Sequence, residues 1–148
     1  MRKITRVVLI IILAAAAYAV YEHYHSEYHG GIESGFVRDD FILGNAFKNH
    51  LSNIQVHDIG IVTSILPDDK EGIPHQRFIV RLGSGQTVLI THNIDLAPRV
   101  TNLAVGDSVE FSGEYEWNPK GGVVHWTHRD PEGHHETGWL KHNGRIFQ

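Results

Sequence analysis

A strict alternation of side chains between residues 108 and 117 is the feature that most constrains the fold. The segment reads SVEFSGEYEW, with apolar residues or Gly at every second position and Ser or Glu between them. Successive side chains of a β-strand point to opposite faces, so the segment predicts a strand with one face in a core and the other in water. The predicted core face carries Val109, Phe111, Tyr115 and Trp117, and the predicted solvent face carries Glu110, Glu114 and Glu116.

A long first strand is expected from Ile54 to Ile65. Ile or Thr stands at every second position from Ile59 onward, whereas Ile54 and Val56 have the opposite phase. The change of phase lies beside Gly60 and predicts a β-bulge or a sharp bend there.

The remaining strands are shorter and are separated by turn compositions. They are expected at residues 77–82, 87–92, 123–128, 139–142 and 145–147. Gly83-Ser84-Gly85 joins the first two as a hairpin, and Asn143-Gly144, the preferred pair of a type I′ turn, joins the last two. Residues 94–103 contain Pro98 and predict a short helical or irregular connection.

One helix is expected before the strands, from Phe36 to Leu51, because Leu43, Phe47 and Leu51 recur at every fourth position. The order of a long bent strand, a hairpin, a connection and a second hairpin matches the OB-fold. We therefore predict a mainly β domain, a small five-stranded OB-like barrel with an N-terminal helix and a C-terminal β-hairpin. An SH3-like barrel or a plain antiparallel sandwich is the alternative.

The N-terminus has the pattern of an export signal or a membrane anchor. Three basic residues among the first six precede an unbroken apolar run from Val7 to Val20. As a helix this run would span about 21 Å, which is less than the ~30 Å hydrocarbon core of a membrane. Ala17-Tyr18-Ala19 offers a cleavage site for signal peptidase, whereas Tyr21 and later tyrosines could anchor an uncleaved segment at the interface.

This pattern predicts three parts of the chain. Residues 1–21 form a signal peptide or N-terminal membrane anchor, residues 22–35 form a His-containing linker, and residues 36–148 form a single OB-like globular domain. Basic residues stay on the cytoplasmic side, so the domain is expected to be exported, either periplasmic or anchored to the inner membrane facing the periplasm. In the second case the N-terminus makes the membrane contact.

Cysteine content and charge limit the classes of function. The chain has no cysteine, which excludes thiol nucleophiles, thiol redox pairs and cysteine metal sites. Without the three basic residues of the N-terminus, 10 Lys and Arg stand against 17 Asp and Glu, a formal charge of −7. Phosphate backbones are bound mainly by positive charge, so nucleic acid is not an expected partner. The 12 histidines can titrate or bind metal.

The run HWTHRDPEGHH, from residue 125 to residue 135, is the candidate metal site. Imidazole suits Zn²⁺, Cu²⁺ or Ni²⁺, and a carboxylate adds an oxygen ligand. The candidate ligands are His125, His128, Asp130 and His134. No cofactor is expected apart from this possible Zn²⁺ or other divalent ion. The alternative is structural, since Asp130-Pro131-Glu132-Gly133 favours a type I turn in which Asp130 fixes the backbone.

Polar and aromatic residues on the strands are candidates for ligand binding. His75 and His92 lie at the two ends of one predicted hairpin and should approach each other. Arg77 and Arg99 supply positive charge, and tryptophans on a barrel face can stack sugars or bases. The candidate residues of this kind are His75, Arg77, His92, Asn93, Arg99, Trp126 and Trp139.

Two long runs resemble a known family. HQRFIVRLGSGQTVLITHNIDLAPRV and GEYEWNPKGGVVHWTHRDPEGHHETGWLKHNG are similar to the bacterial family called domain of unknown function 3465, small proteins with an apolar N-terminus. The resemblance extends from His57 to the C-terminus, leaves the linker out, and implies no activity. Arg129 stands where members often carry a His. The positions that match the family pattern are His75, Gln76, Arg77, His92, Asn93, Asp95, Arg99, Glu114, Glu116, Trp117, His125, Trp126, His128, Asp130, His134 and Trp139.

Three functions remain open, of which an envelope interaction protein is supported only by the acidic face of the strand at residues 108–117. The first is an exported, non-catalytic binding module for a small, saccharide-like or peptidic ligand, because polar and aromatic groups accompany no catalytic spacing. The alternative is a metal-dependent hydrolase, possibly phosphodiester-directed, in which clustered His and Asp130 hold the ion that activates water.

Fusion of residues 1–35 to a reporter that is active only outside the cytoplasm tests the predicted export. The fusion should give signal, and replacing Arg2, Lys3 and Arg6 by Glu should reduce it, because basic residues hold their flank in the cytoplasm. A native protein found only in the cytoplasm would contradict the expectation.

Overall fold

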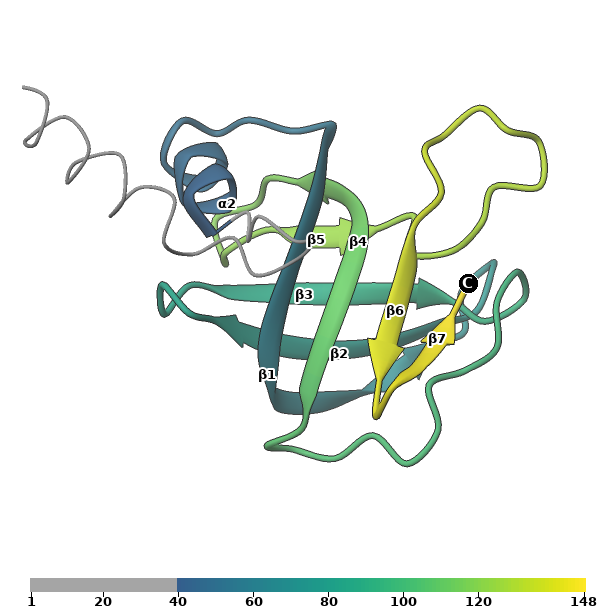
Figure 1. Ribbon diagram of the computed structural model, residues 1–148. Coiled ribbons are helices and arrows are strands. Elements are labelled where there is room, and N and C mark those ends of the chain that lie inside the picture. The colour runs from purple at the N-terminus through teal and green to yellow at the C-terminus, as the bar shows by residue number, and fades with distance from the viewer. Residues whose placement is uncertain (1–39) are drawn as a thin grey trace, which may run out of the picture. The chain divides into compact units, whose positions relative to one another are not determined.

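A computed structural model describes residues 40–148 (Figure 1). The predicted signal or anchor at 1–21 and the linker at 22–35 lie outside the described residues, as do the first four residues of the predicted helix. The described elements are α2 (Asp40–Lys48), β1 (Ile54–Asp69), β2 (His75–Leu82), β3 (Thr87–Asn93), β4 (Ser108–Glu116), β5 (Val123–His125), β6 (Trp139–His142) and β7 (Arg145–Phe147). Within residues 40–148, no helix is long and apolar enough to cross a membrane.

The strands form one sheet of seven, so the prediction of a mainly β domain is confirmed. Their order is β1-β2-β3-β5-β4-β6-β7, and β1 also pairs with β4. The hydrogen bonds therefore join β1, β2, β3, β5 and β4 into a closed ring. All pairs are antiparallel except β3 with β5, which run parallel through Leu89↔Val123 and Ile90↔Val124. The connection before β4 is irregular, and the predicted C-terminal hairpin is present, with Asn143 and Gly144 both at positive φ.

β1 closes the ring because it pairs with two strands. Its first half, Ile54–Ile61, pairs with β4, and its second half, from Gly60 onward, pairs with β2. Gly60 faces inward where the two pairings overlap, and a Cβ atom there would lie 2.7 Å from Val80 Cβ. A side chain at this position would collide with β2, so the close approach requires glycine.

Of the two alternatives predicted beside Gly60, a bulge or a sharp bend, the bulge does not lie at that residue. Val56, Asp58, Gly60 and Val62 are all buried, so β1 keeps one phase through the glycine. The change of register against β2 lies between Val62 and Ser64 instead. The misleading positions are outward-facing isoleucines, since Ile61 and Ile65 are 40% and 46% exposed. Isoleucine suits a pleated strand on either face, so its presence did not identify the buried one.

α2 is shorter than predicted and ends at Lys48. Leu43 is buried, as expected, and so is Ala46, but Leu51 lies past the helix and is 42% exposed. The N–H groups of His50 and Leu51 donate to Phe47 O and Ala46 O, a pairing that closes a helix around a left-handed residue, here His50 with φ of 55°.

Trp117 holds this helix end to β4. Its indole N–H donates to Phe47 O at 3.1 Å, and its ring lies 4.1 Å from the His50 ring. Trp117 therefore packs partly against the core, as predicted, and also gives Phe47 O, in the last turn of the helix, a second donor beside His50 N–H.

β4 has the predicted core face, but the glutamates on its opposite face are only partly exposed to solvent. Val109, Phe111 and Tyr115 are fully buried. On the opposite face, Lys141 reaches Glu110 at 3.0 Å, and the side chain of Glu114 is only 21% exposed. Other strands and loops therefore cover much of this face. The alternation within residues 108–117 could not predict that cover, because it comes from other parts of the chain.

The edge of β4 that faces away from β1 is shared by two strands. β6 pairs with Val109–Ser112 and β5 with Glu114–Glu116, so the edge divides at Gly113. The predicted strand 123–128 therefore stops at His125. Residues 126–138, the excursion loop, leave the sheet and return as β6, and they form the long loop between β5 and β6 in Figure 1.

Backbone contacts close the neck of the excursion loop. Gly138 N–H donates to His128 O at 3.0 Å, and a Cβ atom on Gly138 would collide with Trp126 O. Trp126 itself has a φ of 51°, an uncommon conformation for a bulky residue. The loop therefore begins and ends at fixed points, and its side chains are held near the outer face of β4.

Phe111→Ala tests the assignment of the core. Phe111 is fully buried, so removing its ring should lower the free energy of unfolding by about 3–5 kcal/mol, measured by chemical denaturation. Ile146→Ala is the control, because this side chain is 53% exposed and its loss should change stability by less than about 0.5 kcal/mol. Equal effects of the two changes would contradict the core.

Candidate functional site

A groove of about 330 Å³ crosses the outer face of the sheet. It lies over β2, β3, β5 and β4, which are neighbours in that order, and the end of β1 borders it. The residues that line it are Asp69, His75, Arg77, Thr91, Glu116, Val123 and His125. Of the residues proposed from sequence, His75, Arg77 and His125 are thus brought together.

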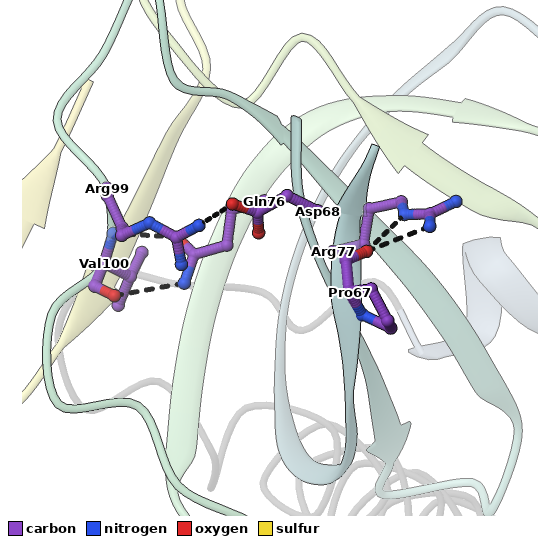
Figure 2. A network of polar contacts seen from close by, with 6 residues as sticks. All are labelled: Pro67, Asp68, Gln76, Arg77, Arg99 and Val100. Atoms are coloured by element: carbon purple, nitrogen blue, oxygen red, sulfur yellow. Dashed lines mark hydrogen bonds and ion pairs between the residues drawn. The ribbon is translucent and has the colours of Figure 1, made fainter. Parts of the chain in front are cut away.

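Arg77 is held in place by the end of β1. Its Nε and Nη2 atoms donate to Pro67 O at 3.1 and 2.9 Å (Figure 2), and Nη1 lies 3.8 Å from Asp69 Oδ2. A guanidinium has five N–H donors, so further donors stay available after these bonds. The groove therefore contains a positive group whose direction is already set.

A second set of contacts ties the end of β1 and the start of β2 to the connection after β3. Figure 2 shows Arg99 paired with Asp68, and Gln76 joined to the backbone of Val100. Gln76 both donates to Val100 O, at 3.1 Å, and accepts from Val100 N–H, at 2.9 Å, and it is buried. Arg99 does not line the groove, and its contact is to the scaffold around it.

His75 has one ring nitrogen committed to the backbone. Its Nδ1 lies 2.7 Å from Ile73 O. A carbonyl oxygen can only accept, so Nδ1 carries the proton and Nε2 of the neutral ring is an acceptor. His75 therefore adds an acceptor to the donors of Arg77 in the groove.

Two glutamates and a histidine form a compact group at the β4 side of the groove. Glu114, Glu116 and His125 each offer one donor atom, and these atoms lie within 4.8 Å of one another. Glu114 and His125 are direct cross-strand partners of β4 and β5, and Glu116 follows two residues later on the same face. Sequence reasoning assigned both glutamates to a solvated face. The pairing of β4 with β5 was the missing information.

His125 is the most constrained member of this group. Its Nε2 is buried without a hydrogen-bond partner and lies 3.7 Å from Glu114 Oε1. Burial lowers the pKa of His125, and the nearby glutamates oppose that shift only in part. The ring is therefore neutral near pH 7, with a nitrogen turned toward two carboxylates.

The excursion loop adds an aromatic pair beside this group. Trp126 and His135 are stacked, with ring centroids 3.8 Å apart and planes at 17°. His135 Nδ1 lies 3.6 Å from Glu114 Oε2, the oxygen that does not face His125. Glu114 is thus flanked by two histidines, one from β5 and one from the loop.

The other proposed metal ligands have separate partners. His128 is buried, and its Nδ1 donates to Arg129 O at 2.9 Å. Asp130 accepts from the backbone N–H groups of Glu132, His134 and His135, and these bonds lower its pKa. The His134 side chain is 74% exposed. Among residues 40–148, only the Glu114 group brings three such ligands together. The turn predicted at Asp130 is present.

Three proposed binding residues lie in structural positions. His92 is fully buried between Thr127 Oγ1, at 2.9 Å, and Pro98 O, at 3.2 Å. Asn93 accepts from the N–H groups of Asp95 and Leu96 and so caps the turn after β3. Trp139 meets His57 edge-on at 4.8 Å. None of the three lines the groove.

Comparison with known proteins identifies a family for this chain. Residues 29–148 match the family described as Protein of unknown function (DUF3465). The chain belongs to this family. The resemblance inferred from sequence is confirmed, but the match begins at residue 29 and includes part of the predicted linker. No curated protein matches the chain. In this DUF3465 member, the groove and the Glu114 group are therefore the basis for any functional proposal.

The buried His92 predicts a pH-dependent stability. Its pKa is lowered to about 4, chiefly by burial, from the ordinary value of 6.5. Between these values the unfolded chain binds a proton that the folded chain does not, so stability falls as the pH drops from 6.5 toward 4, by on the order of 3 kcal/mol. Denaturation at pH 7 and pH 4.5 should show this loss.

His92→Gln removes the titrating group and should lose less stability than the wild type over the same range. His134→Ala, at an exposed position, should behave as the wild type. An equal loss in His92→Gln and the wild type would assign the pH dependence to other groups.

Proposed function

We propose that this chain is an exported binding module in which the ring of five strands is a small OB-like barrel and the groove takes a small saccharide-like ligand. The strand order supports the barrel. A closed ring β1-β2-β3-β5-β4, with β1 shared between two neighbours, is the arrangement of a five-stranded Greek-key barrel. The export part rests on the basic and apolar pattern of residues 1–21.

The place of the groove is the observation that carries the proposal. OB-folds bind their ligands on the face of strands 2 and 3, next to the loop between strands 1 and 2. Here His75 and Arg77 come from β2, Thr91 from β3, and Asp69 from the end of β1 before that loop. The polar residues thus converge on the face that the architecture uses for binding.

The mixture of donors and acceptors favours a ligand rich in hydroxyl groups. Arg77 donates, the carboxylates of Asp69 and Glu116 accept, and Thr91 can do both. A sugar hydroxyl also donates and accepts, so neighbouring hydroxyls can use both kinds of group. A phosphate would meet the two carboxylates, which is unfavourable, and the acidic charge of the domain adds to that cost.

The metal-dependent hydrolase built on Asp130 has weaker support. Three backbone N–H groups already occupy the carboxylate of Asp130. His134, proposed beside it, is exposed next to Glu132. The excursion loop uses Asp130 to order its own turn.

Titration of the ¹⁵N-labelled full chain with neutral mono- and disaccharides tests the proposal. Resonances of His75, Thr91 and His125 should shift. Arg77→Ala should weaken binding by about tenfold or more, because a hydrogen bond from a charged group is worth about 1.5–3 kcal/mol. Arg81→Ala is the matched control, since Arg81 is exposed on the same face of β2 but does not line the groove.

Shifts confined to residues outside the groove, or equal losses in the two arginine variants, would contradict the groove as the binding site. Peptides that shift the groove resonances where saccharides do not would make the ligand peptidic. Arg77→Lys separates charge from geometry, because lysine keeps the charge and loses the planar fork that Pro67 O orients.

A further inference from the structure

Glu114 and Glu116 bring two negative charges to one face of β4, and no Lys or Arg among residues 40–148 forms an ion pair with either. Within the described part of the chain, Lys141 pairs with Glu110, and Arg77 contacts Pro67 and Asp69. The ion pairs of Glu114 are to His125 and His135, and each is longer than 3.5 Å. Like charges on neighbouring positions of one face repel, so the pair is unfavourable unless a cation lies near it.

His125 gives a second and independent observation. Its Nε2 is inaccessible to solvent and makes no hydrogen bond, although buried polar atoms nearly always have a partner. Glu114 Oε1, at 3.7 Å from this nitrogen, is beyond hydrogen-bond range. The ring nonetheless offers one nitrogen within 4.8 Å of an oxygen of each of the two carboxylates.

We propose that Glu114, Glu116 and His125 form a binding site for a first-row divalent metal ion. Zn–N and Zn–O bonds measure about 2.0–2.2 Å, so two donors on one ion are separated by at most about 4.4 Å. The three donor atoms lie within 4.8 Å, and a small rotation of a half-exposed glutamate completes the approach. One ion would satisfy the buried nitrogen and neutralise both carboxylates.

The donor set selects the class of metal. Ca²⁺ and Mg²⁺ prefer oxygen ligands alone, whereas an imidazole with carboxylates suits Zn²⁺ and its neighbours. His135 contacts the far oxygen of Glu114 at 3.6 Å and can fix the direction of that carboxylate. Its stacking on Trp126 holds the ring in place.

The position of the site connects it with the groove. Glu116 and His125 belong to both, so the ion would lie in the groove wall with three protein ligands. A three-ligand site leaves a coordination position for an outside oxygen. The metal site goes beyond the proposed function, because the protein atoms alone would bind the ion with no saccharide present.

Zn²⁺ titration of the metal-stripped full chain, in competition with a chromophoric chelator, tests the site. The wild type should bind one Zn²⁺ that Mg²⁺ does not displace. Glu116→Gln and His125→Ala should each weaken binding by at least about tenfold, the loss that even indirect partners of a metal produce. Glu116→Gln also removes a charge repulsion, so it should fold.

The matched controls are Glu110→Gln, on the same face of β4, and His134→Ala, on the excursion loop; both should bind as the wild type. The His125 imidazole ¹⁵N resonances should shift with one equivalent of Zn²⁺. Unchanged affinity in Glu116→Gln and His125→Ala, no shift at His125, or no Zn²⁺ bound would overturn the site. Saccharide binding measured with a chelator present is independent of these results, so failure of the metal site and failure of the groove are distinguishable.

Discussion

The double pairing of β1 is the constraint on which the rest of the structure depends. One strand pairs with β4 through its first half and with β2 through its second, and this closes five strands into a ring. The overlap falls at Gly60, where a side chain would collide with Val80. Every outward-facing residue of β2, β3, β5 and β4 is placed by that closure, including those that line the groove.

The second constraint is the divided edge of β4. β5 and β6 share this edge, and the thirteen residues from 126 to 138 have to leave the sheet between them. Glycines at 113 and 138 allow the close backbone contacts at the division. The same geometry brings His125 and His135 to opposite oxygens of Glu114. A topological requirement thus assembles the most unusual group of side chains in the described domain.

Polar residues in this protein fall into two kinds that the sequence does not separate. Gln76, His92, Asn93 and Asp130 each satisfy backbone or buried partners and hold loops in place. His75, Arg77, Glu116 and His125 have donors or acceptors left over at the groove. Arg77 and Arg99 illustrate the difference, because both bind the end of β1 but only Arg77 also faces the groove.

The sequence by itself determined the local structure. Alternation located β4 and its buried face, Asn143-Gly144 located the last hairpin, and Asp130-Pro131-Glu132-Gly133 located a turn, because each depends on neighbouring residues alone. Only the tertiary structure decided which isoleucines of β1 face outward, where β5 stops, and that Glu114 and Glu116 lie beside His125. These facts depend on pairing between strands far apart in the chain. The alternating sequence pattern is the same whether a glutamate on the strand faces water or a histidine. Only the pairing of β4 with β5 could distinguish these two environments.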